Sequence, residues 1–179
     1  ARDAAKAARI GPLSHAIKII MNAFYGVLGS SGCRFFDPRL TSSITRRGHE
    51  VLKRSRDYLE AKGLKVIYGD TDSLFVWLGA HDAAHPERTG RKLADELNNW
   101  WRQTLLGEHN VESFLEVEFE THFQRFLMPT LRGSELGSKK RYAGLVNVDG
   151  KAELVFKGLE SVRTDWTPLA RNFQRELYR

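Results

Sequence analysis

Residues 66–78 read Val-Ile-Tyr-Gly-Asp-Thr-Asp-Ser-Leu-Phe-Val-Trp-Leu. Two short apolar runs, residues 66–68 and 74–78, flank a centre that holds two aspartates. Apolar runs of this length, rich in β-branched and aromatic residues and separated by turn-forming residues, predict a β-hairpin. We therefore expect an antiparallel hairpin with Asp70 and Asp72 at its tip.

The hairpin tip has the residue types of a magnesium site. Asp70 and Asp72 are two residues apart, and in extended backbone this spacing points both carboxylates to one side. Mg²⁺ prefers oxygen ligands and keeps waters for substrate phosphates, and a two-metal site stabilises both oxygens of a phosphoryl transfer. Asp-x-Asp is also a common solvated turn, so this motif alone does not separate catalysis from turn formation.

Helices are expected on both sides of the hairpin. Apolar residues recur at helical spacing in residues 13–28, at positions Ile17, Ile20, Met21, Phe24 and Leu28. Helical periodicity also covers about residues 38–62 and 86–106, and the expected buried stripe of the last one is Leu93, Leu97, Trp100, Trp101 and Leu105. Such stripes are typical of amphipathic helices that pack against a core.

The second half of the chain predicts strands. Residues 115–120 alternate strictly between apolar residues and glutamates (Glu116, Glu118, Glu120), which predicts a half-buried strand. A further strand is expected over residues 123–131, and a hairpin over 141–157 around Asp149-Gly150. Thr167-Pro168 predicts the N-cap and first turn of a final helix. Helices mixed with antiparallel hairpins define an α+β fold.

The composition is compatible with a polyanionic partner. Lys and Arg number 28 against 22 Asp and Glu among 179 residues, a net charge of +6. The single cysteine excludes a disulfide within the chain and a cysteine-rich zinc site, and it suits a reducing cytoplasm. Apolar runs are too short to span a membrane, and no signal peptide is evident. The chain starts with Ala1 and stops within an expected helix at Arg179, so we expect a piece of a longer protein.

Two polar patterns could contact nucleotides. Lys18, Asn22 and Tyr25 fall within about a 60° arc of the helix expected over 13–28, offering an ammonium, an amide and a ring on one stripe. Residues 139–142 read Lys-Lys-Arg-Tyr, the densest basic cluster of the chain. Each pattern taken alone would also fit an ordinary solvated surface.

Together, the motifs resemble those of family B DNA polymerases. Lys18-x-x-x-Asn22-x-x-Tyr25-Gly26 is similar to the fingers motif, Tyr68–Ser73 to the metal-binding motif, and Lys139–Tyr142 to the Lys-Lys-x-Tyr motif of that family. Residues 157–160 and 163–166 resemble its palm-to-thumb junction. The sequences of residues 24–29 and 34–40 most resemble those of a bacterial subfamily that is associated with DNA repair and with synthesis past damage.

The resemblance implies a role for each motif. The aspartate matching Asp72 binds the catalytic Mg²⁺ ions, and the one matching Asp70 lies nearby with a lesser role. Lys18 would contact the incoming triphosphate, while Asn22 and Tyr25 would shape the pocket for the nascent base pair. The residues implied to bind primer–template DNA are Lys139, Lys140, Arg141, Tyr142, Lys157 and Arg163.

The resemblance also implies a domain layout. Residues 1–33 would be part of the fingers, 34–166 most of the palm with its antiparallel sheet and packed helices, and 167–179 the start of a helical thumb. The family carries a second essential aspartate in an Asp-x-x-Ser-Leu-Tyr-Pro-like motif, which these 179 residues do not contain. We therefore expect an incomplete two-metal site, and a chain that is inactive by itself.

The implied function is template-directed addition of deoxynucleotides to a primer 3′ end. Deoxynucleoside triphosphates and primer–template DNA are the implied substrates, a sliding clamp is an implied partner of the full-length enzyme, and the implied location is the bacterial nucleoid. The alternatives are a non-catalytic nucleic-acid-binding module and another palm-type enzyme such as a nucleotide cyclase.

Overall fold

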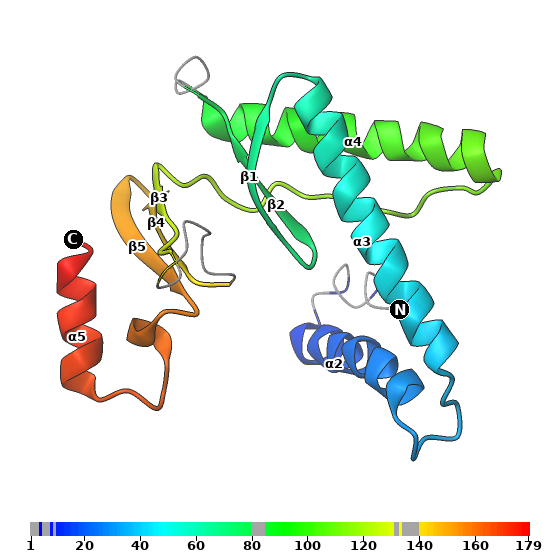
Figure 1. Cartoon of the computed structure of the whole chain (residues 1–179), viewed down its shortest axis with the longest axis horizontal. Helices are drawn as coiled ribbons and strands as arrows, with labels where there is room; N and C mark the ends of the chain where they lie inside the picture. Colours follow the sequence, from blue (N-terminus) through cyan, green and yellow to red (C-terminus); the bar gives the residue numbers. More distant parts are fainter. Residues whose placement is uncertain (1–3, 5–7, 9, 80–84, 131–132, 134–139) are drawn as a thin grey trace. The chain divides into compact units, whose positions relative to one another are not determined.

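The computed structural model describes residues 4, 8, 10–79, 85–130, 133 and 140–179. They belong to two compact units, Ala1–Arg56 and Asp57–Arg179, and the boundary falls within one helix (Figure 1). The elements are helices and antiparallel strands, which confirms the expected α+β class. Among the described residues, no helix combines the length and the hydropathy that crossing a membrane requires.

The first unit is a pair of helices. Helix α2 (Gly11–Gly29) starts with a proline in its first turn, and helix α3 (Pro38–Ala61) follows a short turn. The backbone N–H of Asp37 donates to the carbonyl of Leu28 at 3.1 Å, which closes this turn. The hydroxyl groups of Tyr25 and Thr45 are 2.8 Å apart and link the two helices.

The apolar stripe of α2 does not form a core. Ile20 is 66% exposed and Phe24 is 59% exposed, and no residue of α2 is buried. The prediction of a helix was right, but the expectation that this stripe packs inward was wrong for these side chains. The reason is that no second layer within the described part of the unit covers this face of α2.

The last residues of α3, which belong to the second unit, pack tightly against another helix of that unit. The end of α3 meets helix α4 (Pro86–His109), where the rings of Tyr58 and Trp100 stack with centroids 4.8 Å apart. Trp101 is only 1% exposed, and Leu97 is also buried, as the predicted stripe requires. Gly63 follows α3 with φ at +83°, the left-handed geometry that ends many helices.

The strands form two small antiparallel sheets. Strands β1 (Lys65–Asp70) and β2 (Ser73–Trp77) are one sheet, and β3 (Arg125–Leu127), β4 (Tyr142–Val148) and β5 (Lys151–Lys157) are the other. The hairpins β1–β2 and β4–β5 confirm the two predicted turns. The strand expected from residue 123 onward is shorter than predicted and is restricted to β3.

A cluster of aromatic rings joins the two sheets. Phe75 of β2 lies at its centre, with ring centroids 5.4 Å from Tyr68, 5.1 Å from Phe126 and 5.3 Å from Tyr142. Phe123 stacks on the same ring at 6.1 Å. A Cβ atom on Gly144 would lie 2.1 Å from the Phe123 ring, so the absent side chain lets this ring lie against β4.

Residues 115–120 are not a strand, contrary to the prediction. Their burial still alternates as the pattern required, with the glutamates exposed. What differs is the hydrogen bonding, because the side chain of Asn98 takes the place of a neighbouring strand. Its amide donates to the carbonyl of Val117 at 2.8 Å, and its oxygen accepts from the N–H of Val117 at 2.7 Å.

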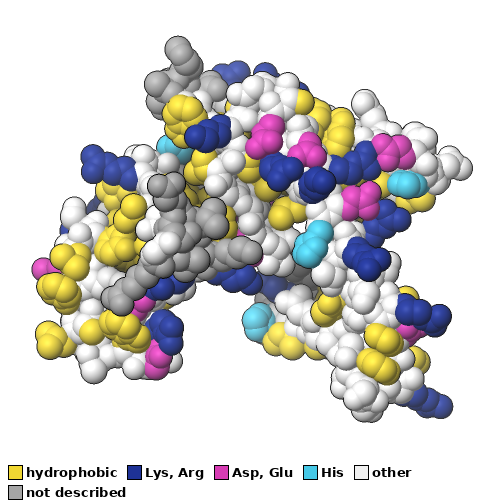
Figure 2. All heavy atoms as spheres, in the orientation of Figure 1, with side chains coloured by type: hydrophobic (Ala, Val, Ile, Leu, Met, Phe, Trp, Pro, Cys, Tyr) yellow, Lys and Arg dark blue, Asp and Glu magenta, His cyan; other side chains and the backbone are white. Residues whose placement is uncertain are grey.

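The chain ends in a short amphipathic helix. Helix α5 (Pro168–Leu177) follows a short 3₁₀ turn, η1 (Glu160–Val162), and the hydroxyl of Thr167 caps its first turn by accepting from the N–H of Ala170. This cap confirms the prediction from sequence. Three apolar side chains four residues apart stay exposed on α5, and Figure 2 shows hydrophobic side chains at the surface in this region. They are Leu169, Phe173 and Leu177.

The two hydrogen bonds between the Asn98 side chain and the backbone of Val117, called the Asn98 clamp below, give a first prediction. Asn98→Ala should lower the free energy of unfolding by about 2–3 kcal/mol, because it leaves the N–H and the carbonyl of the half-buried Val117 without their partner. Urea denaturation of the 179-residue chain measures this loss. The matched control is Asn99→Ala on the exposed side of the same helix, which should change stability by about 0.5 kcal/mol or less. Equal effects of the two substitutions would contradict the clamp.

Candidate active site

The acidic hairpin tip is built by the smallest possible turn. Asp70 pairs with Ser73, so only Thr71 and Asp72 connect β1 to β2. Thr71 has φ at +49°, in the left-handed region. Its hydroxyl donates to a carboxylate oxygen of Asp70 at 3.1 Å, and the hydroxyl of Ser73 donates to the carbonyl of Asp70 at 3.3 Å. Local hydrogen bonds therefore fix the conformation of the tip.

The two aspartates differ in their surroundings. Asp70 closes β1 and is half-buried, whereas Asp72 lies in the turn and is exposed. The expectation that both side chains point to one side rested on extended backbone, which the left-handed Thr71 interrupts between them. The direction of the two carboxylates therefore stays a prediction. The prediction that both residues are at the tip is confirmed.

The structure brings Lys140 to this hairpin. The Lys140 Nζ lies 3.8 Å from Asp70 Oδ1, and the backbone N–H of Lys140 donates to the Tyr68 hydroxyl at 2.8 Å. Lys140 has φ at +63°, and a Cβ atom on Gly158 would lie 2.1 Å from its carbonyl oxygen. Glycine at position 158 is therefore needed for Lys140 to sit between β1 and the end of β5.

Tyr142 follows on β4 and joins the aromatic cluster. Burial raises the pKa of its phenol, and the negative charges of Glu120, Tyr68 and Asp70 raise it further. Of the three glutamates in residues 115–120, Glu120 is thus the one whose charge acts on this group. The sequence pattern alone did not distinguish among them.

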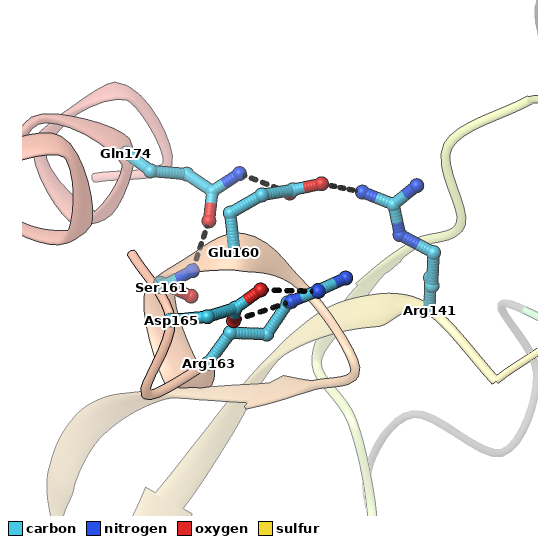
Figure 3. A network of polar contacts seen from close by, with 6 residues as sticks. All are labelled: Arg141, Glu160, Ser161, Arg163, Asp165 and Gln174. Atoms are coloured by element: carbon cyan, nitrogen blue, oxygen red, sulfur yellow. Dashed lines mark hydrogen bonds and ion pairs between the residues drawn. The ribbon is translucent and has the colours of Figure 1, made fainter. Parts of the chain in front are cut away.

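The two arginines predicted to bind DNA have carboxylate partners (Figure 3). Arg141 forms an ion pair with Glu160, and Arg163 binds Asp165 through two nitrogens, with Nε 2.9 Å from Oδ1. The hydrogen bonds from Arg163 lower the pKa of Asp165, and this pairing raises that of Arg163. Lys140 also has a carboxylate within 4 Å, but its side chain is 69% exposed, against 40% for Arg141. Lys157 at the end of β5 is exposed. Lys139 lies outside the described residues.

Glu160 is the centre of a polar network that sequence analysis missed. Its second oxygen accepts from the side-chain amide of Gln174 on α5 at 2.8 Å, and the amide oxygen of Gln174 accepts from the N–H of Ser161 (Figure 3). The hydrogen bond from Gln174, with smaller contributions from the backbone N–H of Glu160 and from Arg141, holds the pKa of the Glu160 carboxyl below its ordinary value. Partners 14 and 19 residues away along the chain leave no local sequence signal.

The predicted nucleotide-binding residues all lie on α2, in the first unit. Lys18, Asn22 and Tyr25 are all exposed, and the hydroxyl of Tyr25 forms a hydrogen bond with that of Thr45. Their roles stay predictions. The structure thus groups the site residues into one set on α2 and another on the hairpin, β4 and the turn before α5.

The donor chemistry of the tip fits magnesium. Among the described residues no group of three or more His, Cys, Asp or Glu side chains could hold a metal ion. Asp70 and Asp72 nevertheless supply hard carboxylate oxygens on a hydrogen-bonded turn, the ligand type that Mg²⁺ prefers. Two such residues would hold an ion only together with further ligands.

The described site residues thus comprise an acidic hairpin tip with a lysine beside it in the second unit, and a polar stripe on α2 in the first. The chain belongs to DNA polymerase family B, whose model matches residues 2–179. This membership confirms the resemblance that the motifs indicated.

Individual relatives agree with this assignment. The chain is 60% identical over 178 residues to DNA polymerase II of Escherichia coli, which supports the expected bacterial subfamily. It is 32% identical over 164 residues to the DNA polymerase alpha catalytic subunit of Mus musculus, and 32% identical over 161 residues to a DNA polymerase of Archaeoglobus fulgidus. These matches cover 99%, 88% and 90% of this chain. They cover only 23%, 10% and 17% of the relatives, so the chain spans less than a quarter of their lengths.

The lowered pKa of Glu160 makes stability depend on pH. A carboxylate favoured in the folded state contributes stability that is complete above its unfolded pKa and is lost as the pH falls through the folded pKa. Between about pH 5 and pH 3, the chain should therefore lose more thermal stability than its Glu160→Gln variant. Thermal melts across this range test the expectation, and parallel losses in both proteins would contradict it.

Proposed function

We propose that this chain is the part of a DNA-directed DNA polymerase that adds deoxynucleotides to a primer 3′ end by phosphoryl transfer. The observation that carries the proposal is the hairpin tip, which holds Asp70 and Asp72 and has Lys140 3.8 Å from Asp70, in a chain that belongs to family B. Family membership favours a polymerase over a nucleotide cyclase or a non-catalytic binding module.

The proposed layout follows the family. Residues 1–33 are assigned to the fingers, 34–166 to the palm and 167–179 to the start of the thumb. The structural support is that α2 belongs to a different compact unit from the two sheets, and that Thr167 caps a new helix. In this layout the predicted nucleotide-binding residues fall in the fingers, and the predicted metal-binding and DNA-binding residues fall in the palm.

Each set has a distinct task in the proposed reaction. Asp72, with Asp70 in a lesser role, would hold Mg²⁺, which when bound stabilises the charge on the attacking and leaving oxygens. Lys18 would bind the triphosphate of the incoming nucleotide, and Asn22 and Tyr25 would shape the pocket around its base. Lys18 is exposed at the surface of α2, where its ammonium can reach a phosphate.

Duplex binding is assigned to β4 and the segments beside it. Lys140 has a side chain that is 69% exposed, although it is close to Asp70, so its ammonium remains accessible to a backbone phosphate. Lys139, Tyr142 and Lys157 are proposed to act with it. Contacts of this kind fix the register of a duplex without reading its sequence, which suits a protein that must accept any template.

Magnesium, deoxynucleoside triphosphates and primer–template DNA are therefore the proposed cofactor and substrates. By similarity to DNA polymerase II of Escherichia coli, we place the full-length protein at the bacterial nucleoid. Its proposed work there is repair or damage-bypass synthesis, with a sliding clamp as a proposed partner.

A substitution at the tip tests the metal-binding role. In the full-length enzyme, Asp72→Asn should reduce primer extension by at least about 100-fold while primer–template affinity changes little, because the amide keeps the size but loses the charge and metal ligation. The matched control is Asp149→Asn, an exposed aspartate in the two-residue turn of the β4–β5 hairpin. Near-normal extension by the Asp72 variant would refute the assignment.

The 179-residue chain should not extend a primer by itself. It lacks the Asp-x-x-Ser-Leu-Tyr-Pro-like motif that supplies the family's other metal-binding aspartate, and two carboxylates on one turn do not make a two-metal site. A primer-extension assay with the purified chain, alone and mixed with a separately made remainder of the enzyme, measures this. Extension regained only in the mixture supports a divided site, whereas extension by the chain alone would place the active site elsewhere.

A further inference from the structure

Arg141 is less available to a DNA phosphate than its neighbour Lys140. Its side chain is 40% exposed, against 69% for Lys140, and its guanidinium pairs with Glu160, whose side chain is only 17% exposed. The Nε of Arg141 is buried and has no hydrogen-bond partner among the described residues. A phosphate that approached Arg141 would have to displace a carboxylate that is already largely shielded from water.

The carboxylate of Glu160 is itself held from the other side. One oxygen binds Arg141, and the other accepts from Gln174, whose amide oxygen binds the backbone N–H of Ser161 (Figure 3). Ser161 is fully buried, and its carbonyl accepts a further hydrogen bond from Arg175 at 3.4 Å. Both the oxygen and the nitrogen of the Gln174 amide thus form hydrogen bonds. The segment before β4 is connected to α5 through the side chains of Arg141, Glu160 and Gln174.

We propose that Arg141 is a positioning residue: acting through Glu160 and Gln174, it ties the segment that holds Lys140 and leads into β4 to helix α5, and does not itself bind a phosphate. This inference rests on the proposed function and refines it, since Arg141 was among the residues predicted to bind DNA. In this proposal the lysines make the contacts with the duplex, and the network couples the position of α5 to that of β4.

The salt dependence of DNA binding separates the two roles of Arg141. Each phosphate contact adds about 0.9 to the slope of log affinity against log salt concentration. In the full-length enzyme, Arg141→Met should therefore leave the slope unchanged. Glu160→Gln should make the slope steeper by about 0.9, the amount expected for one more phosphate contact, because the released Arg141 guanidinium can reach the duplex. The variant that carries both Arg141→Met and Glu160→Gln should return to the slope of the unmodified enzyme.

Lys140→Met provides the reference in the same assay. Its slope should become shallower by about 0.9, the amount expected for one lost phosphate contact, if Lys140 binds DNA as proposed. If Lys140→Met and Arg141→Met both leave the slope unchanged, the proposed duplex-binding strand fails. If Arg141→Met lowers the slope as Lys140→Met does, the strand binds DNA but the positioning role is overturned.

Hydrogen exchange tests the link to α5 without DNA and without activity. Arg141→Met and Gln174→Met should each speed the exchange of the α5 amides, because each breaks one step of the connection. Lys140→Met, which lies outside the network, should leave exchange in α5 unchanged. Unaltered protection of α5 in both network variants would overturn the proposed coupling.

Discussion

The packing of aromatic rings around Phe75 is the interaction on which the rest of the second unit depends. The sheets β1–β2 and β3–β5 share no ladder of backbone hydrogen bonds in the described residues, so side chains must hold them together. Rings at the observed separations of 5–6 Å bury large areas and prefer offset or tilted contacts. Because Tyr68 and Tyr142 belong both to this cluster and to the candidate site, the apolar packing also sets the distance between Asp70 and Lys140.

Local signals account for what the sequence predicted well. The β1–β2 and β4–β5 turns, the Thr167 cap and the buried stripe of α4 each depend on residues close together in the chain. Residues 115–120 were predicted as a strand because their alternation is genuine. Alternation reports which face is buried, however, and says nothing about what satisfies the backbone, which here is a side chain from α4.

The candidate site divides in the same way. The two aspartates could be placed at a hairpin tip from sequence, and the family motifs nominated the lysines. The contact between Lys140 and Asp70 joins residues 70 positions apart and depends on the glycine at 158, so no local pattern encodes it. The run of basic residues before β4 likewise suggested that all of its cations are available to DNA. Arg141 is instead paired with a carboxylate, and that carboxylate comes from a 3₁₀ turn with no distinctive motif.

The left-handed Thr71 gives the hairpin tip a property that its ligands alone do not. A β-branched residue with positive φ is about 1–2 kcal/mol less favourable than glycine there, so neighbouring contacts must hold this conformation. The hydrogen bonds from Thr71 and Ser73 to Asp70 are contacts of this kind. Glycine would relax the turn but would let its backbone sample many more conformations. The threonine narrows that ensemble before any ion arrives, so less conformational entropy remains to be lost on binding.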